Sequence, residues 1–136
     1  MEKKIILWTS DLATGITWQD YQHLEFLRFT NNLFDDFYSN KGAVEIDAAV
    51  LYLERYAKDH FNIEERYMNQ FKYAASTEHK AEHRAFQEFI NNMKDIDQAS
   101  TLEGARLCNK LNNWFVNHIQ KIDTALGEFL KQQGQA

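Results

Sequence analysis

All five histidines of the chain fall on core-type positions of helical repeats, and two acidic residues join them: His23, His60, Glu64, His79, His83, His118 and Asp123. A single histidine on an apolar helix face is usually a core residue bonded to a carbonyl, but seven such groups are a different case. Each buried polar group costs on the order of 1 to 3 kcal/mol if it is left unsatisfied. That cost threatens a net stability of about 5 to 15 kcal/mol. Bound metal would compensate it, so the pattern predicts a buried metal centre.

The spacing of these residues supports shared metal ions. Two pairs are separated by four residues, His60 with Glu64 and His79 with His83. Residues four apart on an α-helix lie about 40° and about 6 Å from each other, so each pair faces one point. The five-residue step from His118 to Asp123 leaves about 140° between them on an ideal helix. Either a local π-type widening or side-chain reach would bring Asp123 onto the same face.

The number of candidate ligands indicates two metal ions. Five imidazoles and two carboxylates exceed the ligand number of a zinc site, and a chain with one cysteine, Cys108, has no cysteine cluster. If both carboxylates and a hydroxide bridge two octahedral ions, one coordination position stays open. Imidazole and carboxylate ligands suit iron, manganese or zinc, and a pair with one vacancy favours iron that binds a small diatomic molecule.

Four helical segments position these residues. The chain has no proline and only five glycines, and 44% of its residues are hydrophobic, which favours long helices. Apolar residues spaced by three and four predict four helices, over residues 17 to 40–42, 46 to 71, 79 to 93, and 100 to near the C-terminus. Sequences that look like capping boxes stand at Thr17–Asp20 and Ser100–Glu103.

We therefore expect an all-α fold, an antiparallel up-down-up-down four-helix bundle. A single domain would span residues 1–136, with an N-terminal arm at 1–17 and the bundle at 18–132. Trp8, Leu12 and Ile16 would pin the arm to the bundle, although the sequence does not say where.

Charge and composition restrict the partners. The net charge is −5 and the pI about 5.5, without a lysine or arginine run, so nucleic acid is not an expected partner. The N-terminal apolar stretch, residues 5–8, is too short for a signal peptide or a membrane span, so we expect a cytoplasmic protein without a membrane partner. Cys108 excludes an internal disulfide and, if buried, is an inert small hydrophobe.

Several segments together resemble the bacterial hemerythrins: Gly15-Ile16, Asp20-Tyr-Gln-His23, Asn31, His60-Phe-Asn-Ile-Glu-Glu-Arg-Tyr-Met68, His79-x-x-x-His83 and Trp114-Phe-Val-Asn-His-Ile-x-x-x-Asp123. They run across almost the whole chain and contain all seven candidate ligands in order. The resemblance implies a four-helix bundle around a non-haem di-iron centre with a bridging oxo or hydroxo group. It also implies the ligand set: His79, His83 and His118 on one iron, His23 and His60 on the second, and Glu64 and Asp123 as bridges.

The resemblance further implies a function for the open position, which would belong to the second iron. Dioxygen would bind there reversibly, so we expect a non-enzymatic oxygen carrier, store or scavenger. One alternative is an oxygen or redox sensor that signals to an unknown protein partner. Another is a di-iron enzyme that handles oxygen, nitric oxide or iron. This alternative is disfavoured because oxidases of the ferritin type use Glu-x-x-His pairs, and the chain has none.

Bound oxygen needs a dry pocket, because water would promote its loss. Six apolar residues beside the candidate ligands are expected to form the pocket wall, a role that does not exclude their being ordinary bundle core: Phe26, Leu27, Phe61, Trp114, Phe115 and Ile119. The resemblance implies that Phe115 stands at a gate position where bacterial members commonly carry leucine, so we expect altered oxygen access or autoxidation.

Polar neighbours of the ligands complete the expectations. Asp20 and Gln22 are candidates to orient the ring of His23. For Asp20 the alternative is a favourable position near a helix N-terminus. Three acidic residues close to ligands are expected to be solvated: Glu65, Glu78 and Glu82.

Overall fold

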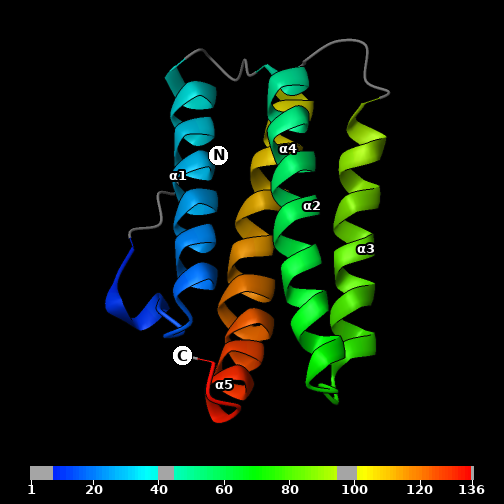
Figure 1. The fold of residues 1–136 in the computed structure, drawn as a ribbon. Coiled ribbons are helices and arrows are strands. Elements are labelled where there is room, and N and C mark those ends of the chain that lie inside the picture. Colours follow the sequence, from blue (N-terminus) through cyan, green and yellow to red (C-terminus); the bar gives the residue numbers. More distant parts are fainter. Residues whose placement is uncertain (1–7, 40–44, 95–100, 136) are drawn as a thin grey trace.

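The computed structural model describes residues 8–39, 45–94 and 101–135 as a helical bundle, in which no strand occurs (Figure 1). Its main elements are α1 (Thr17–Ser39), α2 (Ile46–Gln70), α3 (Ser76–Met93), α4 (Thr101–Trp114), a π-helical segment η2 (Phe115–Asp123) and α5 (Thr124–Gln132). α4, η2 and α5 follow one another without a break and form a fourth rod. Successive rods run in opposite directions (Figure 1). The predicted all-α, antiparallel four-helix bundle is therefore confirmed.

The ends of two predicted elements lie outside the described residues. These are the end of the first helix near Asn40–Gly42 and Ser100 of the second capping box. The turn between α2 and α3 is described, and it is tight although it lacks glycine. Lys72 adopts a φ of 54° there, and the Tyr73 N–H donates to the carbonyl of Met68 at 3.0 Å. This left-handed residue closes α2 and returns the chain directly into α3.

Two apolar clusters fill the bundle and leave a polar layer between them. The smaller cluster contains Ile16, Met68, Leu126 and Leu130, and the larger one fills the rest of the bundle. On α2 the polar residue Glu64 lies between Phe61 of the larger cluster and Met68 of the smaller one. The fourth rod repeats this order around Asp123. The polar layer therefore crosses the bundle and is shielded from both sides.

The N-terminal arm docks beside the start of α1 through both apolar and polar contacts. Trp8 and Leu12 pack against the larger cluster, and Ile16 is fully buried in the smaller one, as predicted. One Asp20 carboxylate oxygen accepts from the Thr14 N–H at 2.7 Å and from the Thr14 hydroxyl at 2.9 Å. Asp20 thus fixes the arm, and the prediction that it orients His23 is wrong.

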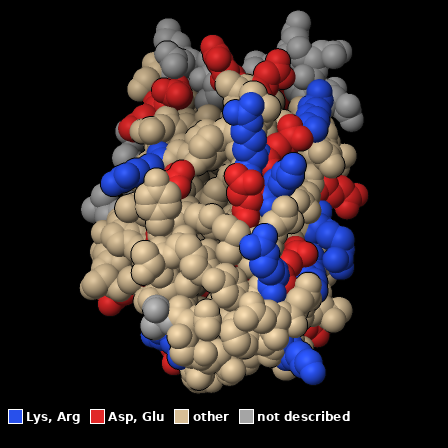
Figure 2. All heavy atoms as spheres, in the orientation of Figure 1, with Lys and Arg blue, Asp and Glu red and all other residues tan. Residues whose placement is uncertain are grey.

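Charged side chains of both signs are interspersed over the face formed by α2 and α3 (Figure 2). Lys94 and Glu54 form one of the ion pairs of this surface. Within the described parts of the chain, no helix has the length and apolar character needed to cross a membrane. In contrast to these surface charges, the buried acids and histidines among the described residues all lie in the polar layer.

Candidate metal centre

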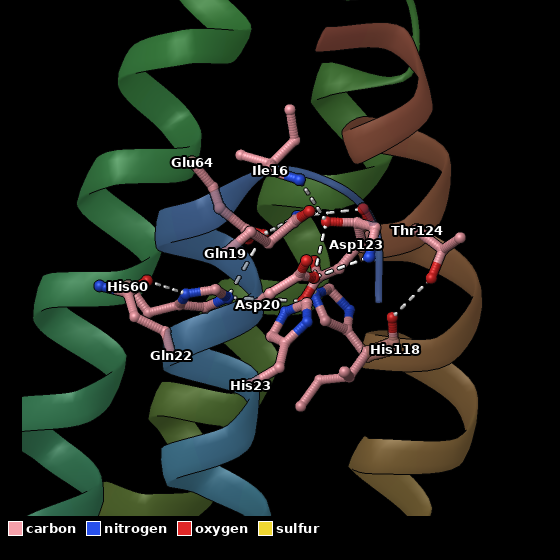
Figure 3. A network of polar contacts seen from close by, with 12 residues as sticks. Ile16, Gln19, Asp20, Gln22, His23, His60, Glu64, His118, Asp123 and Thr124 are labelled. Carbon is pink, nitrogen blue, oxygen red and sulfur yellow. Dashed lines mark hydrogen bonds and ion pairs between the residues drawn. The ribbon is translucent and has the colours of Figure 1, made fainter. Parts of the chain in front are cut away.

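Seven ionisable side chains from four rods converge in the polar layer. Figure 3 shows His23, His60, Glu64, His118 and Asp123 of this set. They are His23 of α1, His60 and Glu64 of α2, His79 and His83 of α3, and His118 and Asp123 of η2. None of them is more than 1% exposed. These are the seven residues that the sequence predicts as ligands, and the structure brings all of them together.

The π-helical segment explains how Asp123 joins His118. An α-helix would turn the two side chains about 140° apart, but Phe115–Asp123 is a π-helix and both residues are buried on its inner face. A π-helix shifts the backbone hydrogen bonds, and the Thr124 hydroxyl donates to the carbonyl of Ile119 at 3.3 Å. Of the two explanations that the sequence left open, π-type widening is confirmed.

Three histidines face one side of the two carboxylates, and we call them the three-histidine group: His79, His83 and His118. Asp123 Oδ1 lies 2.9 Å from His79 Nε2 and 3.0 Å from His118 Nε2. Glu64 Oε1 lies 3.0 Å from His83 Nε2 and 3.3 Å from His79 Nε2. All three imidazoles thus direct Nε2 at the same pair of carboxylate oxygens.

His23 and His60, which we call the two-histidine group, face the opposite oxygens. Asp123 Oδ2 lies 3.0 Å from His23 Nε2 and 3.4 Å from His60 Nε2. Glu64 Oε2 lies 3.3 Å from His60 Nε2. Each carboxylate therefore offers one oxygen to each group, which is the arrangement of two bridging ligands.

These separations suit ligands that share a metal ion, and several of them are also hydrogen-bond distances. Adjacent ligands of an octahedral ion, each about 2.1 Å from it, lie about 3.0 Å apart. The nitrogen-to-oxygen distances within the two groups are 2.9 to 3.4 Å. His118 Nε2 is buried and lacks a hydrogen-bond partner among the described residues. Asp123 Oδ1 nevertheless lies only 3.0 Å from it. An ion between the two atoms would satisfy both.

The electrostatics of the metal-free cluster also attract cations. Burial alone would lower the pKa of His60, but Glu64 and Asp123 outweigh it and raise the pKa to about 10. The same opposition raises the pKa of His79 to about 9. Burial would raise the pKa of Asp123, yet His118 and the other imidazoles hold it well below its usual range. Two buried negative charges thus draw protons onto the imidazoles, and a metal ion can replace those protons.

Three of the imidazoles donate their outer N–H to a neighbouring side chain. His83 Nδ1 donates to Glu65 at 2.8 Å and His118 Nδ1 to Glu82 at 2.7 Å. The expectation that Glu65 and Glu82 are merely solvated is therefore wrong, although each stays partly exposed. Such partners fix the ring orientation and make the imidazole a stronger ligand. Glu78 is exposed, as expected.

The two-histidine group has a neutral partner instead. His60 Nδ1 donates to the Gln22 amide oxygen, so Gln22 orients His60 and the prediction that it orients His23 is wrong. The rings of His23 and His60 meet edge to face, with centroids 5.2 Å apart. Carboxylate partners on one group and an amide on the other make the two histidine groups electrically unequal.

The Glu82→Gln substitution tests this outer contact. Glu82 lies at a surface hollow of about 190 Å³ that Trp114 and His118 also line, so the change should not disturb the fold. Loss of an outer carboxylate commonly weakens metal binding by about 10- to 100-fold. We expect a weakening of this order at the three-histidine group, measured by competition with a chelator. Glu78→Gln is the matched control, and equal weakening by both variants would contradict the expectation.

Gln19 is a polar residue of the site that is not predicted from the sequence. It is fully buried, and its amide N–H₂ donates to Glu64 Oε2 and to the backbone carbonyl of Asp123, both at 3.0 Å. Its position four residues before His23 is a helical spacing that could have revealed it. Gln19 links both carboxylate ligands and holds Glu64 in place.

Gly127 makes room for this amide. An added Cβ at Gly127 would lie 2.7 Å from Gln19 Oε1 and 2.8 Å from Thr14 Cβ. Glycine-to-alanine changes inside helices usually stabilise by about 0.5 to 1 kcal/mol. For Gly127→Ala we expect the opposite, a loss of about 1 to 3 kcal/mol from overpacking. Urea unfolding of the metal-free protein measures it, and an unchanged or higher stability would contradict the expectation.

The six predicted pocket-wall residues are all buried in the larger apolar cluster: Phe26, Leu27, Phe61, Trp114, Phe115 and Ile119. Two of them stack directly on the three-histidine group. Phe61 lies 3.8 Å from His83 and Trp114 lies 3.8 Å from His118, in both cases between ring centroids. Apolar rings therefore shield the inner side of this group from water.

A four-helix bundle with two facing groups of histidines and two shared carboxylates belongs to the class of proteins that hold metal in the bundle core. The family described as "Hemerythrin HHE cation binding domain" matches residues 14–130. Proteins called bacteriohemerythrin are similar over most of the chain. The one from Pseudomonas aeruginosa (strain LESB58) is 31% identical over 87% of this chain and 76% of its own length. The one from Methylococcus capsulatus is 28% identical over 93% and 97%. The chain belongs to the hemerythrin family.

Proposed function

We propose that this chain binds two non-haem iron ions with a bridging oxo or hydroxo group, and that it binds dioxygen reversibly. The three-histidine group and the two-histidine group would hold one ion each, and Glu64 and Asp123 would bridge them. The observation that carries this function is that each carboxylate turns one oxygen to each group. Because one group has one imidazole fewer, its ion would keep a position open for a small molecule.

The seven candidate ligands and their surroundings suit reversible binding of oxygen. When bound, the iron pair would lend electrons to dioxygen and recover them on its release. The protein holds the ions with five imidazoles and only two carboxylates, so little negative charge is present to stabilise high-valent iron. Burial of all seven groups keeps water away from the bound oxygen. These features favour an oxygen carrier, store or scavenger over an oxidising enzyme.

The test is a cycle of oxygenation. The protein is loaded with ferrous iron without air, oxygen is added and then removed, and the visible spectrum is recorded at each step. An absorption band that appears with oxygen and vanishes on its removal is the expected result. Continued oxygen consumption would show an enzyme instead. Complete oxidation in the first cycle, without recovery, would rule out reversible binding.

Phe115 offers a test of the proposed gate. It is 1% exposed at the start of η2, in the larger apolar cluster. We expect Phe115→Leu to admit small molecules faster, because a smaller side chain leaves space beside the ligands. Oxygen binding, followed by stopped flow, and autoxidation should both speed up. Leu107→Met, a substitution of similar volume in the same cluster, is the control, and unchanged rates in Phe115→Leu would remove Phe115 from the access route.

A further inference from the structure

The hydroxyl of Tyr56 is buried and has no hydrogen-bond partner among the described residues. Tyr56 precedes His60 by one turn of α2, and the two rings stack with centroids 5.2 Å apart and planes 16° apart. Tyr56 also packs beside Phe26, with ring centroids 5.1 Å apart. Tyr56 therefore lies against the two-histidine group.

The phenol oxygen also lies within electrostatic reach of the carboxylate ligands. Burial raises the pKa of Tyr56 well above its usual value, and Asp123 and Glu64 raise it further. A neutral phenol carries a hydrogen that it can donate. Buried hydroxyls without a partner are rare in folded proteins and require an explanation, of which a missing ligand is one.

We propose that the Tyr56 hydroxyl donates a hydrogen bond to the small molecule that occupies the open position of the two-histidine group. This role rests on the proposed function, because it requires a metal ion held by His23 and His60. It would favour ligands that carry negative charge on an atom away from the metal. Dioxygen that has gained electrons and small anions such as azide belong to this class.

Tyr52 is the neighbouring tyrosine on the same face of α2, and its ring stacks on Phe29, whereas that of Tyr56 stacks on His60. Tyr52 lies one turn before Tyr56, its ring centroid is 4.1 Å from that of Phe29, and its pKa is raised by burial, then by Glu25 and Tyr21. Glu64 and Asp123 affect the pKa of Tyr56 but are not among the causes of the shift at Tyr52. Tyr52→Phe removes the same hydroxyl chemistry from α2 without touching the polar layer, so it is the matched control.

The experiment compares the wild type, Tyr56→Phe and Tyr52→Phe, each loaded with iron and then oxidised. Azide is the probe, because its terminal nitrogen accepts a hydrogen bond. We expect azide to bind about tenfold more weakly to Tyr56→Phe, as loss of one hydrogen bond to a charged acceptor predicts. Tyr52→Phe should stay close to the wild type. The azide stretching frequency should shift in D₂O for the wild type and not for Tyr56→Phe.

Iron content and thermal stability separate this role from a structural one. Tyr56→Phe should keep two irons and unfold at the same temperature as the wild type or higher, because it removes a buried hydroxyl without a partner. Unchanged azide affinity in Tyr56→Phe would overturn the inference. If the wild type fails to release oxygen while the azide results hold, the proposed function fails and the role of Tyr56 stands. If the wild type takes up no metal, both fail.

Discussion

Asp123→Ala should abolish binding of both metal ions. One oxygen of this carboxylate lies 2.9 Å from His79 Nε2, and the other lies 3.0 Å from His23 Nε2. Both proposed ions therefore share Asp123, and the substitution deprives each of an anionic ligand. Iron bound after anaerobic loading and desalting should fall from about two ions per chain to well below one. Elemental analysis against protein concentration measures it.

Two further variants serve as comparisons for the iron content of Asp123→Ala. His118→Ala removes a ligand from the three-histidine group alone, so its iron content should fall below two ions while more remains than in Asp123→Ala. Glu128→Ala removes an acid of α5 that is 62% exposed and should keep both ions. Circular dichroism must show that every variant remains helical. Two irons retained by a folded Asp123→Ala variant would exclude Asp123 as a bridging ligand.

The sequence predicts both the bundle and the convergence of the seven candidate ligands, because both depend on helical periodicity. On α2, Leu53, Ala57, His60 and Glu64 repeat at spacings of three and four, and all four are buried. A stripe of this kind can be buried only against neighbouring helices. Polar residues that continue an apolar stripe must therefore meet one another inside the bundle.

Contacts between helices were harder to predict, because they depend on how each rod is rotated and which rods are neighbours. Glu82 is separated from His118 by 36 residues, and it reaches the outer nitrogen of His118 only because α3 lies beside η2. Gln22 stands next to His23 in the sequence but points to His60 on α2. Periodicity describes one helix at a time, so it gives no information on such pairs.

The hydrogen bonds of the arm and the burial of the Tyr56 hydroxyl escaped prediction for a different reason. The sequence predicts that Asp20 orients the ring of His23, yet Asp20 accepts hydrogen bonds from Thr14, which lies in an irregular segment that has no period. Tyr56 lies on α2 and is only half-buried as a residue, although its hydroxyl is buried. A pattern of residues cannot show which end of a side chain faces the core.

Removal of the metal should lower the melting temperature by about 10 °C or more. A ligand present at about a thousand times its dissociation constant stabilises the folded state by about 4 kcal/mol, and each kcal/mol is worth several degrees in a domain of this size. The site adds a structural reason, because without metal the charges of the fully buried Glu64 and Asp123 are balanced only by protonated imidazoles. Calorimetry of protein before and after chelation measures the shift. Asp123→Ala is the control, since added metal should leave its melting temperature nearly unchanged, and equal melting temperatures for metal-free and metal-loaded wild type would contradict a metal centre in this layer.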